Sequence, residues 1–202
     1  MNKKLTPIII PCHWHTGSSL ISKTLENCGM NTGNKKTFWD DSCIDNCEHY
    51  LLNNTIATVV NNEHKDVNQN IEQVRIILEG YKNEAEHNNW KFYGVKTTHL
   101  LQSWDIFGKV FQTCWPDAIY VIGIQHPIQI AKTLKSKPHG AKYSKKELYD
   151  YVTNSWLKAC EGIKDILTLK NQIHIIDCPA SWHKNEIKTI INMATIIDAI
   201  KI

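Results

Sequence analysis

The chain has 202 residues, and its 23 Lys and Arg against 20 Asp and Glu give a formal net charge of +3. This length fits one domain with a sizeable core, and 42% hydrophobic with 21% charged residues is typical of a folded globular protein. The charge is too small, and the lysines are too scattered, to indicate a nucleic-acid-binding protein. No apolar run is long enough to span a bilayer and no segment resembles a signal peptide, so we expect neither nucleic-acid nor membrane partners.

Hydrophobic periodicity and turn signals predict strands that alternate with helices. In chain order we expect a strand at 5–12, helix at 18–27, loop at 31–41, helix at 42–53, polar turn-like segment at 61–70, long amphipathic helix at 67–88, strand at 92–95, helix at 99–114, strand at 118–124, helix at 127–136, loop at 137–144, helix at 146–169, strand at 172–177 and helix at 184–199. This order indicates an α/β fold with a mainly parallel sheet. No repeat or linker divides the chain, so we expect a single domain over residues 1–202.

The loop after the first predicted strand is rich in small and hydroxyl-bearing residues. Residues 11–20 read Pro-Cys-His-Trp-His-Thr-Gly-Ser-Ser-Leu and run into the next helix. In parallel sheets ligands bind at the carboxyl ends of strands, and the backbone N–H groups at a helix start attract anions. The loop is not a GxxxxGK[ST] phosphate loop, because the second glycine and the lysine are missing. An ordinary capped helix explains this loop as well as an anion site does.

Three further segments of the chain favour the anion site over the ordinary capped helix. The order His15, Thr16, Gly17, Ser18, Ser19, Leu20 resembles the 5′-phosphosulfate loop of the sulfotransferase family, roughly [RK]-S-G-T-[ST]-[LWF]. The strand followed by Gln125-His126-Pro127 and then Thr133 resembles the family's strand–R-[DHN]-P-x5-S segment, which holds the donor's 3′-phosphate. Residues 96–100, Lys-Thr-Thr-His-Leu, resemble the K-T-H-L stretch of cytosolic members, and residues 37–41 resemble the family's aromatic–acidic segment.

The resemblance implies a three-layer α/β/α fold with a mainly parallel central sheet, of the P-loop NTPase-like sulfotransferase type. It implies 3′-phosphoadenosine-5′-phosphosulfate (PAPS) as co-substrate, no metal, and transfer of a sulfuryl group to a hydroxyl or amine of a small-molecule or glycan acceptor. His99 is the implied base, since an imidazole titrates near neutral pH. Lys96 is implied to stabilise the leaving group, and His15 to lie over the phosphosulfate. The alternative for His99 and Lys96 is an exposed helix start and a solvated lysine.

The basic positions of the family pattern are altered in this chain. His15 occupies the donor-loop Lys/Arg position, Gln125 the 3′-phosphate arginine position, and Thr133 the position of its serine partner. A charge-assisted hydrogen bond is worth roughly 1.5–3 kcal/mol, so a neutral Gln125 weakens donor binding about ten- to a hundredfold. The single arginine of the chain, Arg75, lies in the predicted helix 67–88 and in none of these motifs. Lys132 and Lys135 are the nearest candidates to replace the missing charge, in the expected helix after Pro127.

Two other classes of function remain open from the sequence. A non-catalytic relative would keep the fold and bind another anion or a protein partner, which Gln125 and His15 favour. A nucleotide kinase needs magnesium and a loop lysine, which the loop lacks.

The seven cysteines lie far apart, so reduced thiols and a cytoplasmic protein are expected. Two groups contain metal-ligand residue types: Cys12, His13 and His15, and Cys43, Cys47 and His49. Neither has the CxxC spacing of structural zinc sites.

Overall fold

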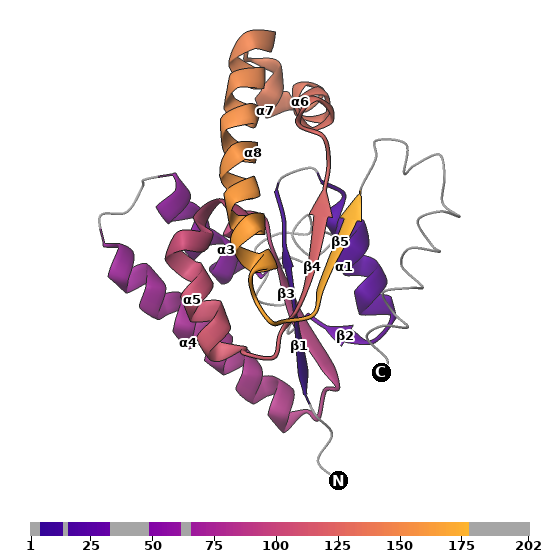
Figure 1. The fold of residues 1–202 in the computed structure, drawn as a ribbon, viewed down its shortest axis with the longest axis vertical. Helices are drawn as coiled ribbons and strands as arrows, with labels where there is room; N and C mark the ends of the chain where they lie inside the picture. The colour runs from indigo at the N-terminus through magenta and orange to yellow at the C-terminus, as the bar shows by residue number, and fades with distance from the viewer. Residues whose placement is uncertain (1–4, 14–15, 33–48, 62–65, 178–202) are drawn as a thin grey trace.

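The computed structural model describes residues 5–13, 16–32, 49–61 and 66–177. Five strands form one parallel sheet in the order β2-β3-β1-β4-β5, with helices packed on both faces (Figure 1). The strands are β1 (Thr6–Pro11), β2 (Met30–Asn31), β3 (Phe92–Thr97), β4 (Ile119–Ile124) and β5 (Ile173–Asp177). The expected α/β fold with a parallel sheet is therefore confirmed.

The central strand β1 fixes the register of the sheet. It pairs with β3 along its whole length, from Thr6 opposite Phe92 to Pro11 opposite Thr97. On its other side it pairs with β4, and a bridge between Cys12 and Gly123 extends this pairing to the strand ends. The carboxyl ends of β1, β3 and β4 consequently lie side by side.

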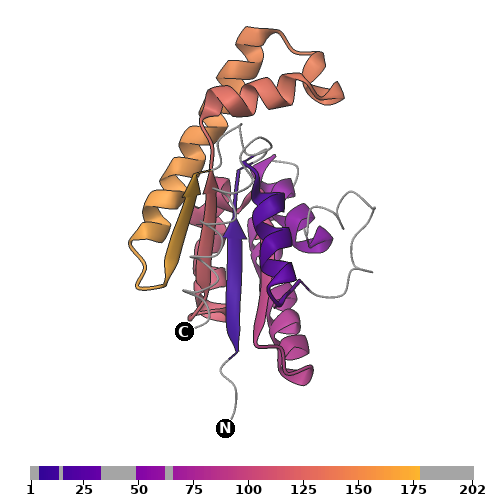
Figure 2. The same ribbon diagram turned by 90° about the vertical axis from the view of Figure 1, so that its right-hand side faces the viewer.

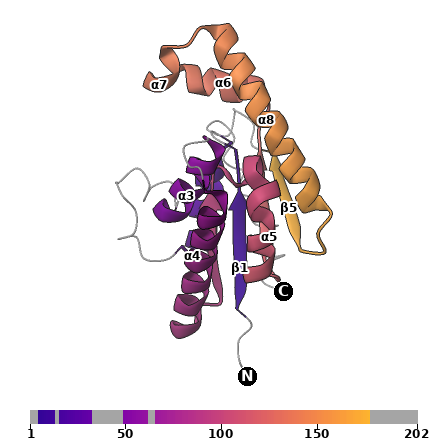
Figure 3. The ribbon, with the colours of Figure 1, turned by 90° about the vertical axis from the view of Figure 1, so that its left-hand side faces the viewer.

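Alternate residues of β1 contribute to two separate cores. Ile8 and Ile10 pack with Ile21 and Leu25 of α1 (Ser18–Asn27) on one face. Ile9 lies in the larger core on the other face, because successive side chains of a strand point to opposite sides. That face is covered by α3 (Tyr50–Val60), α4 (Val67–His87), the 3₁₀ helix η2 (Leu100–Ser103), α5 (Trp104–Cys114) and α8 (Lys145–Leu167) (Figures 2 and 3).

Two short helices and the first half of a long one lie beyond the carboxyl ends of the strands. The strand arrows point toward α6 (Pro127–Lys135), α7 (Pro138–Ala141) and the first half of α8 (Figures 1 and 3). Leu134 of α6 packs with Leu148 and Val152 of α8 in a small core of its own. Within the described ranges, no helix combines the length and apolarity that would let it cross a membrane.

Most expected elements occur close to their predicted bounds. The four expected strands are present, and α1 begins and ends at the predicted residues. Pro127 occupies the first turn of α6, as expected from its missing N–H. The predicted helix at 99–114 begins as the 3₁₀ turn η2 before it becomes α5. The two-residue strand β2 was not predicted, because so short an edge strand leaves no alternation to read.

Two predictions differ from the structure. The helix expected at 42–53 overlaps α3 only from Tyr50, which follows the N-cap His49, and α3 continues to Val60, because Leu52, Ile56 and Val59 share one buried face. The loop expected at 137–144 contains the short helix α7. Residues 42–48 of the expected helix, the loop beyond residue 32 and the final helix at 184–199 fall outside the described residues.

A glycine permits the close contact between α8 and η2. A Cβ added at Gly162 of α8 would lie 2.2 Å from the backbone oxygen of Leu101. Only a residue without a side chain allows this approach, so Gly162 sets the distance between the two helices.

We therefore expect Gly162→Ala to lower the free energy of unfolding by about 1–3 kcal/mol, the usual cost of overpacking. Gly80→Ala is the matched control, because a Cβ at this exposed position in α4 would meet nothing within 4 Å. Helix propensity predicts that Gly80→Ala stabilises the protein by up to about 1 kcal/mol. Urea unfolding of both variants measures the difference, and equal effects would contradict the steric argument.

Candidate functional site

The described residues of the loop between β1 and α1 are Cys12, His13, Thr16 and Gly17, and the last three form hydrogen bonds within the loop or to the first turn of α1. Gly17 precedes α1 in the left-handed conformation, with φ of 78°. The Thr16 hydroxyl donates to the His13 carbonyl at 2.8 Å, and the Leu20 N–H donates to the Gly17 carbonyl at 3.0 Å. In the described part of the chain, no side chain caps the first turn of α1. The positive end of this helix is therefore presented by backbone groups, while His15 lies outside the described residues.

Lys96 reaches this loop from the neighbouring strand. It lies opposite Ile10 in the sheet, on the face that α1 covers, and is only 2% exposed. Its ammonium Nζ donates to Ser19 Oγ in the first turn of α1 at 3.0 Å. The ammonium and the positive end of the α1 dipole thus act on the same space, which favours an anion there.

The loop after β4 lies beside the first loop. Gln125 follows β4 and is 9% exposed, and among the described residues its Oε1 has no hydrogen-bond partner. The backbone carbonyl of Gln125 accepts a hydrogen bond from Trp156 Nε1 of α8 at 3.1 Å. His126 caps α6 by accepting from the Ile128 N–H at 3.2 Å. Thr133 lies farther along α6 and is partly buried.

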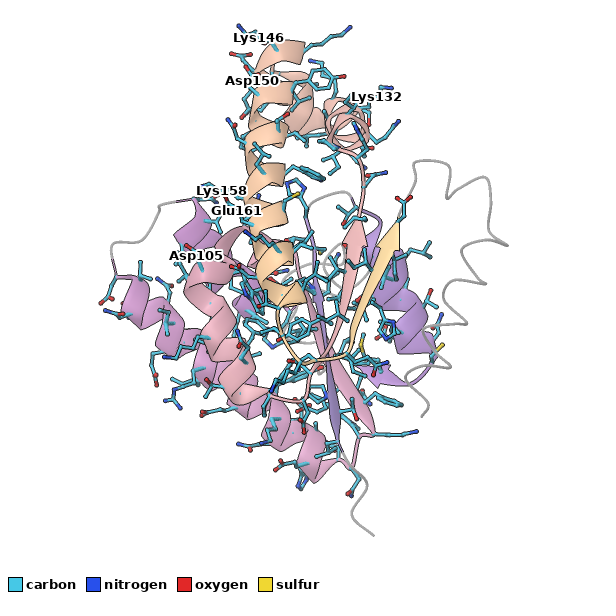
Figure 4. All side chains as sticks on the ribbon, in the orientation of Figure 1. Asp105, Lys132, Lys146, Asp150, Lys158 and Glu161 are labelled. Atoms are coloured by element: carbon cyan, nitrogen blue, oxygen red, sulfur yellow. The ribbon has the colours of Figure 1, made fainter. Side chains whose placement is uncertain are left out.

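The two lysines considered as replacements for the missing arginine have different surroundings. Lys135 Nζ donates to the Ala141 carbonyl at the end of α7, at 3.0 Å. Its ammonium therefore stabilises the carboxyl end of that helix. Lys132 is exposed on α6 (Figure 4).

His99 lies on the α8 side of the site, whereas Lys96 faces α1. His99 is half-buried at the start of η2, and its Nδ1 lies 3.4 Å from Gln102 Oε1. Gln102 Nε2 donates to Ser155 Oγ of α8, and the same hydroxyl is hydrogen-bonded to Nε2 of His13, which is 2% exposed. We call this chain of His13, Ser155, Gln102 and His99 the relay.

Two adjoining hollows lie beside the relay, and Gln102 and Lys158 line both. The smaller has a volume of about 200 Å³ and is lined by Val60, Asn61, Gln102, Tyr151, Asn154, Ser155 and Lys158. The larger, of about 340 Å³, is lined by Leu101, Gln102, Trp104, Asp105, Lys158, Glu161, Gly162 and Asp165. Figure 4 shows Asp105, Lys158 and Glu161 grouped on this side of α8. Amide and charged side chains make the larger hollow mainly polar and suited to a polar ligand, whereas the surface of the smaller one is mainly apolar.

The catalytic and donor-binding residues expected from the sequence include none from α8. Ser155 and Trp156 are neighbours, yet they contact the loops after β1 and β4 respectively. A signal was present, because Ser155 occupies a position among the buried residues Val152 and Ala159. A hydroxyl on the core face of a helix needs a polar partner, and here the partners are His13 and Gln102.

No metal site is formed by the residues that the structure describes, since no group of three or more His, Cys, Asp or Glu has a suitable arrangement. Cys12 and His13 are described, and the Cys12 thiol donates to the Thr97 carbonyl at 3.5 Å. Cys43 and Cys47 lie outside the described residues.

Helix α3 supports the segment that carries His99. Asn53 Oδ1 accepts from the Thr98 N–H at 3.3 Å. His49 caps α3, with Nδ1 accepting from the Leu52 N–H at 3.4 Å. Burial lowers the pKa of His49 below its ordinary value of 6.5, so the folded state favours the neutral ring that can accept this bond.

Comparison with protein-family models finds no match, and comparison with curated proteins finds none. The family resemblance therefore depends on the motifs and on where the fold positions them.

We expect acid to destabilise the protein partly through His49. Because its pKa is lowered on folding, the unfolded state binds more protons, so the stabilisation is complete above about pH 6.5 and is lost as the pH falls below it. His49→Asn keeps a capping oxygen but removes the titration. Unfolding free energies between about pH 7 and pH 5 should fall less for this variant than for the wild type. His87→Asn, an exposed histidine in α4, is the control, and equal slopes for His49→Asn and wild type would contradict the expectation.

Proposed function

We propose that the chain is a sulfotransferase with a P-loop NTPase-like fold that moves a sulfuryl group from PAPS to a hydroxyl or amine of a small-molecule or glycan acceptor. The contact between Lys96 Nζ and Ser19 Oγ carries this proposal. It joins two of the segments that resemble the family, although they lie 77 residues apart in the chain. Both segments supply positive potential, as the 5′-phosphosulfate requires.

The sheet topology supports a donor site at the first loop. From β1 the chain turns to α1 on one face, whereas from β3 and β4 it turns to η2, α5 and α8 on the other. Ligands of open α/β sheets bind where neighbouring connections leave to opposite faces. The loop after β1, with Lys96 on one side and Gln125 on the other, lies at such a point.

The proposed reaction is an in-line displacement at sulfur. The acceptor oxygen or nitrogen forms a bond to sulfur while the bond from sulfur to the bridging oxygen breaks, and adenosine 3′,5′-bisphosphate leaves. His99 takes the acceptor proton, and Lys96 offsets the negative charge that develops on the leaving phosphate oxygen. Such a step depends on positioning and charge stabilisation, and no metal is part of the proposal.

Gln125 favours a second candidate, a sulfotransferase-like protein that binds an anion without transferring a sulfuryl group. Its neutral amide occupies the 3′-phosphate position, where a guanidinium would give a bidentate, charge-assisted contact. Assay of sulfate transfer from labelled PAPS to a panel of alcohols, sugars and amines separates the two candidates. Binding of adenosine 3′,5′-bisphosphate without any transfer would support the second.

We expect Lys96→Met to weaken binding of adenosine 3′,5′-bisphosphate about ten- to a hundredfold, the value of a charge-assisted hydrogen bond. Isothermal titration calorimetry measures this change. Lys109→Met is the control, because Lys109 is exposed on α5 and its loss removes the same net charge. If the wild type binds none of this nucleotide at millimolar concentration, the proposed donor site is wrong.

Gln125→Arg tests the altered 3′-phosphate position by restoring the charge. We expect this variant to bind adenosine 3′,5′-bisphosphate roughly tenfold more tightly than the wild type, but to bind adenosine 5′-phosphate with little change. Ser136→Arg adds the same charge at an exposed position at the end of α6 and should have little effect on either nucleotide. Equal tightening by both arginines would indicate a general electrostatic effect instead of a local contact.

A further inference from the structure

The relay joins three parts of the chain that are distant in sequence. Ser155 and His13 are 142 residues apart, and Ser155 and Gln102 are 53 apart. His13 and Ser155 are buried, so the side-chain polar atoms of these two residues depend on protein partners. The close contact at Gly162 holds α8 against η2, which keeps Ser155 within reach of Gln102.

The donors and acceptors of the relay run in one direction. The Gln102 amide nitrogen can only donate, and it donates to Ser155 Oγ. The amide oxygen of Gln102, which can only accept, therefore faces Nδ1 of His99. A hydrogen bond between them requires the proton of His99 to be on Nδ1, which leaves the lone pair on Nε2.

The contact between His13 and Ser155 is compatible with this orientation of the Gln102 amide. When Nε2 of His13 is unprotonated, it accepts the one proton that Ser155 Oγ can give. The hydroxyl oxygen then has only acceptor sites left, so the amide nitrogen of Gln102, rather than its oxygen, must face Ser155. Reversal of the amide would place two acceptors, Ser155 Oγ and Gln102 Oε1, against each other.

We propose that Gln102, Ser155 and His13 are positioning residues that hold His99 in the Nδ1–H tautomer, so that Nε2 is the nitrogen that takes the acceptor proton. The role of Nε2 as base rests on the proposed sulfotransferase function, whereas the tautomer does not. A hydrogen bond to one ring nitrogen fixes which nitrogen carries the proton, and the relay supplies that bond. Because Gln102 and Ser155 also line the smaller hollow, a ligand bound there would lie against the relay.

The tautomer can be measured directly by long-range ¹H–¹⁵N correlation spectra of the full chain labelled in its histidines. His99→Gln identifies the His99 signals by their loss. We expect the wild type to contain predominantly Nδ1–H His99, and Gln102→Leu to contain predominantly Nε2–H His99. Gln102→Glu is the conservative variant: one carboxylate oxygen still accepts from Nδ1–H of His99, the Ser155 hydroxyl can rotate to donate to the other, and the wild-type tautomer should be retained.

The second position of the relay gives an independent pair of variants. Ser155→Ala should reduce the Nδ1–H population of His99, and Ser155→Thr, which retains the hydroxyl, should preserve it. Ser136→Ala is the control at an exposed serine. A wild-type His99 found mainly as Nε2–H, or a tautomer unchanged in both Gln102→Leu and Ser155→Ala, would overturn the proposal.

Kinetics separate the relay from the proposed function. In the sulfuryl-transfer assay, Gln102→Leu should lower kcat roughly tenfold or more while leaving KM for PAPS unchanged, because Gln102 itself contacts His99 and Ser155 and not the donor loop. A full kcat in Gln102→Leu despite the changed tautomer would refute the role of Nε2. If the wild type transfers no sulfuryl group, the proposed function is wrong, and the spectra still decide whether the relay fixes the tautomer.

Discussion

The register between β1 and β3 is the constraint on which the candidate site depends. Pairing from Thr6–Phe92 to Pro11–Thr97 places Lys96 opposite Ile10, on the face covered by α1. A slip of one residue would turn every side chain of one strand to the opposite face. Lys96 would then point away from Ser19 and into the large apolar core. A buried ammonium without a polar partner is strongly unfavourable in such a core. The burial of Ile8, Ile9 and Ile10 in two different cores makes that slip costly.

Helix α8 organises the other half of the site. Successive residues of a helix point about 100° apart, so Ser155 and Trp156 can contact two different loops. One loop follows β1 and the other follows β4, and both lie at the carboxyl edge of the sheet. The helix begins with a capping box between Ser144 and Glu147, which satisfies backbone donors at its exposed start. The positions of both loops therefore depend on how α8 packs on the sheet.

Sequence reasoning was most successful where the pattern is local and repeated. Hydrophobic periodicity located α1 and α4, which each bury one face, and apolar, β-branched segments located the four longer strands. The resemblance grouped Lys96 with Ser19, and the two are in contact. Arg75 was expected outside the site and lies exposed on α4, paired with Glu72 and Glu79.

The relay could not be predicted in the same way. A hydrogen bond between Ser155 and His13 depends on how α8 packs across the sheet, and no local pattern encodes that packing. The course of α3 beyond Asn53 was missed for a related reason, since it depends on the tertiary burial of Ile56 and Val59. Gln125 was identified by its place in a motif, but its carbonyl bond to Trp156 has no counterpart in the local sequence.

The continuity of α8 has a mechanical consequence. Its 23 residues make one rod of roughly 35 Å, with its first half against α6 and its second half against η2. A straight helix bends little without a proline or a break in its hydrogen bonds, and α8 contains no proline. If α8 tilts at its α6 end, it turns about the tight contact at Gly162 and displaces Ser155 and Trp156 together. Because these neighbouring residues are hydrogen-bonded to His13 and Gln125, one movement of α8 acts on both loops at the edge of the sheet.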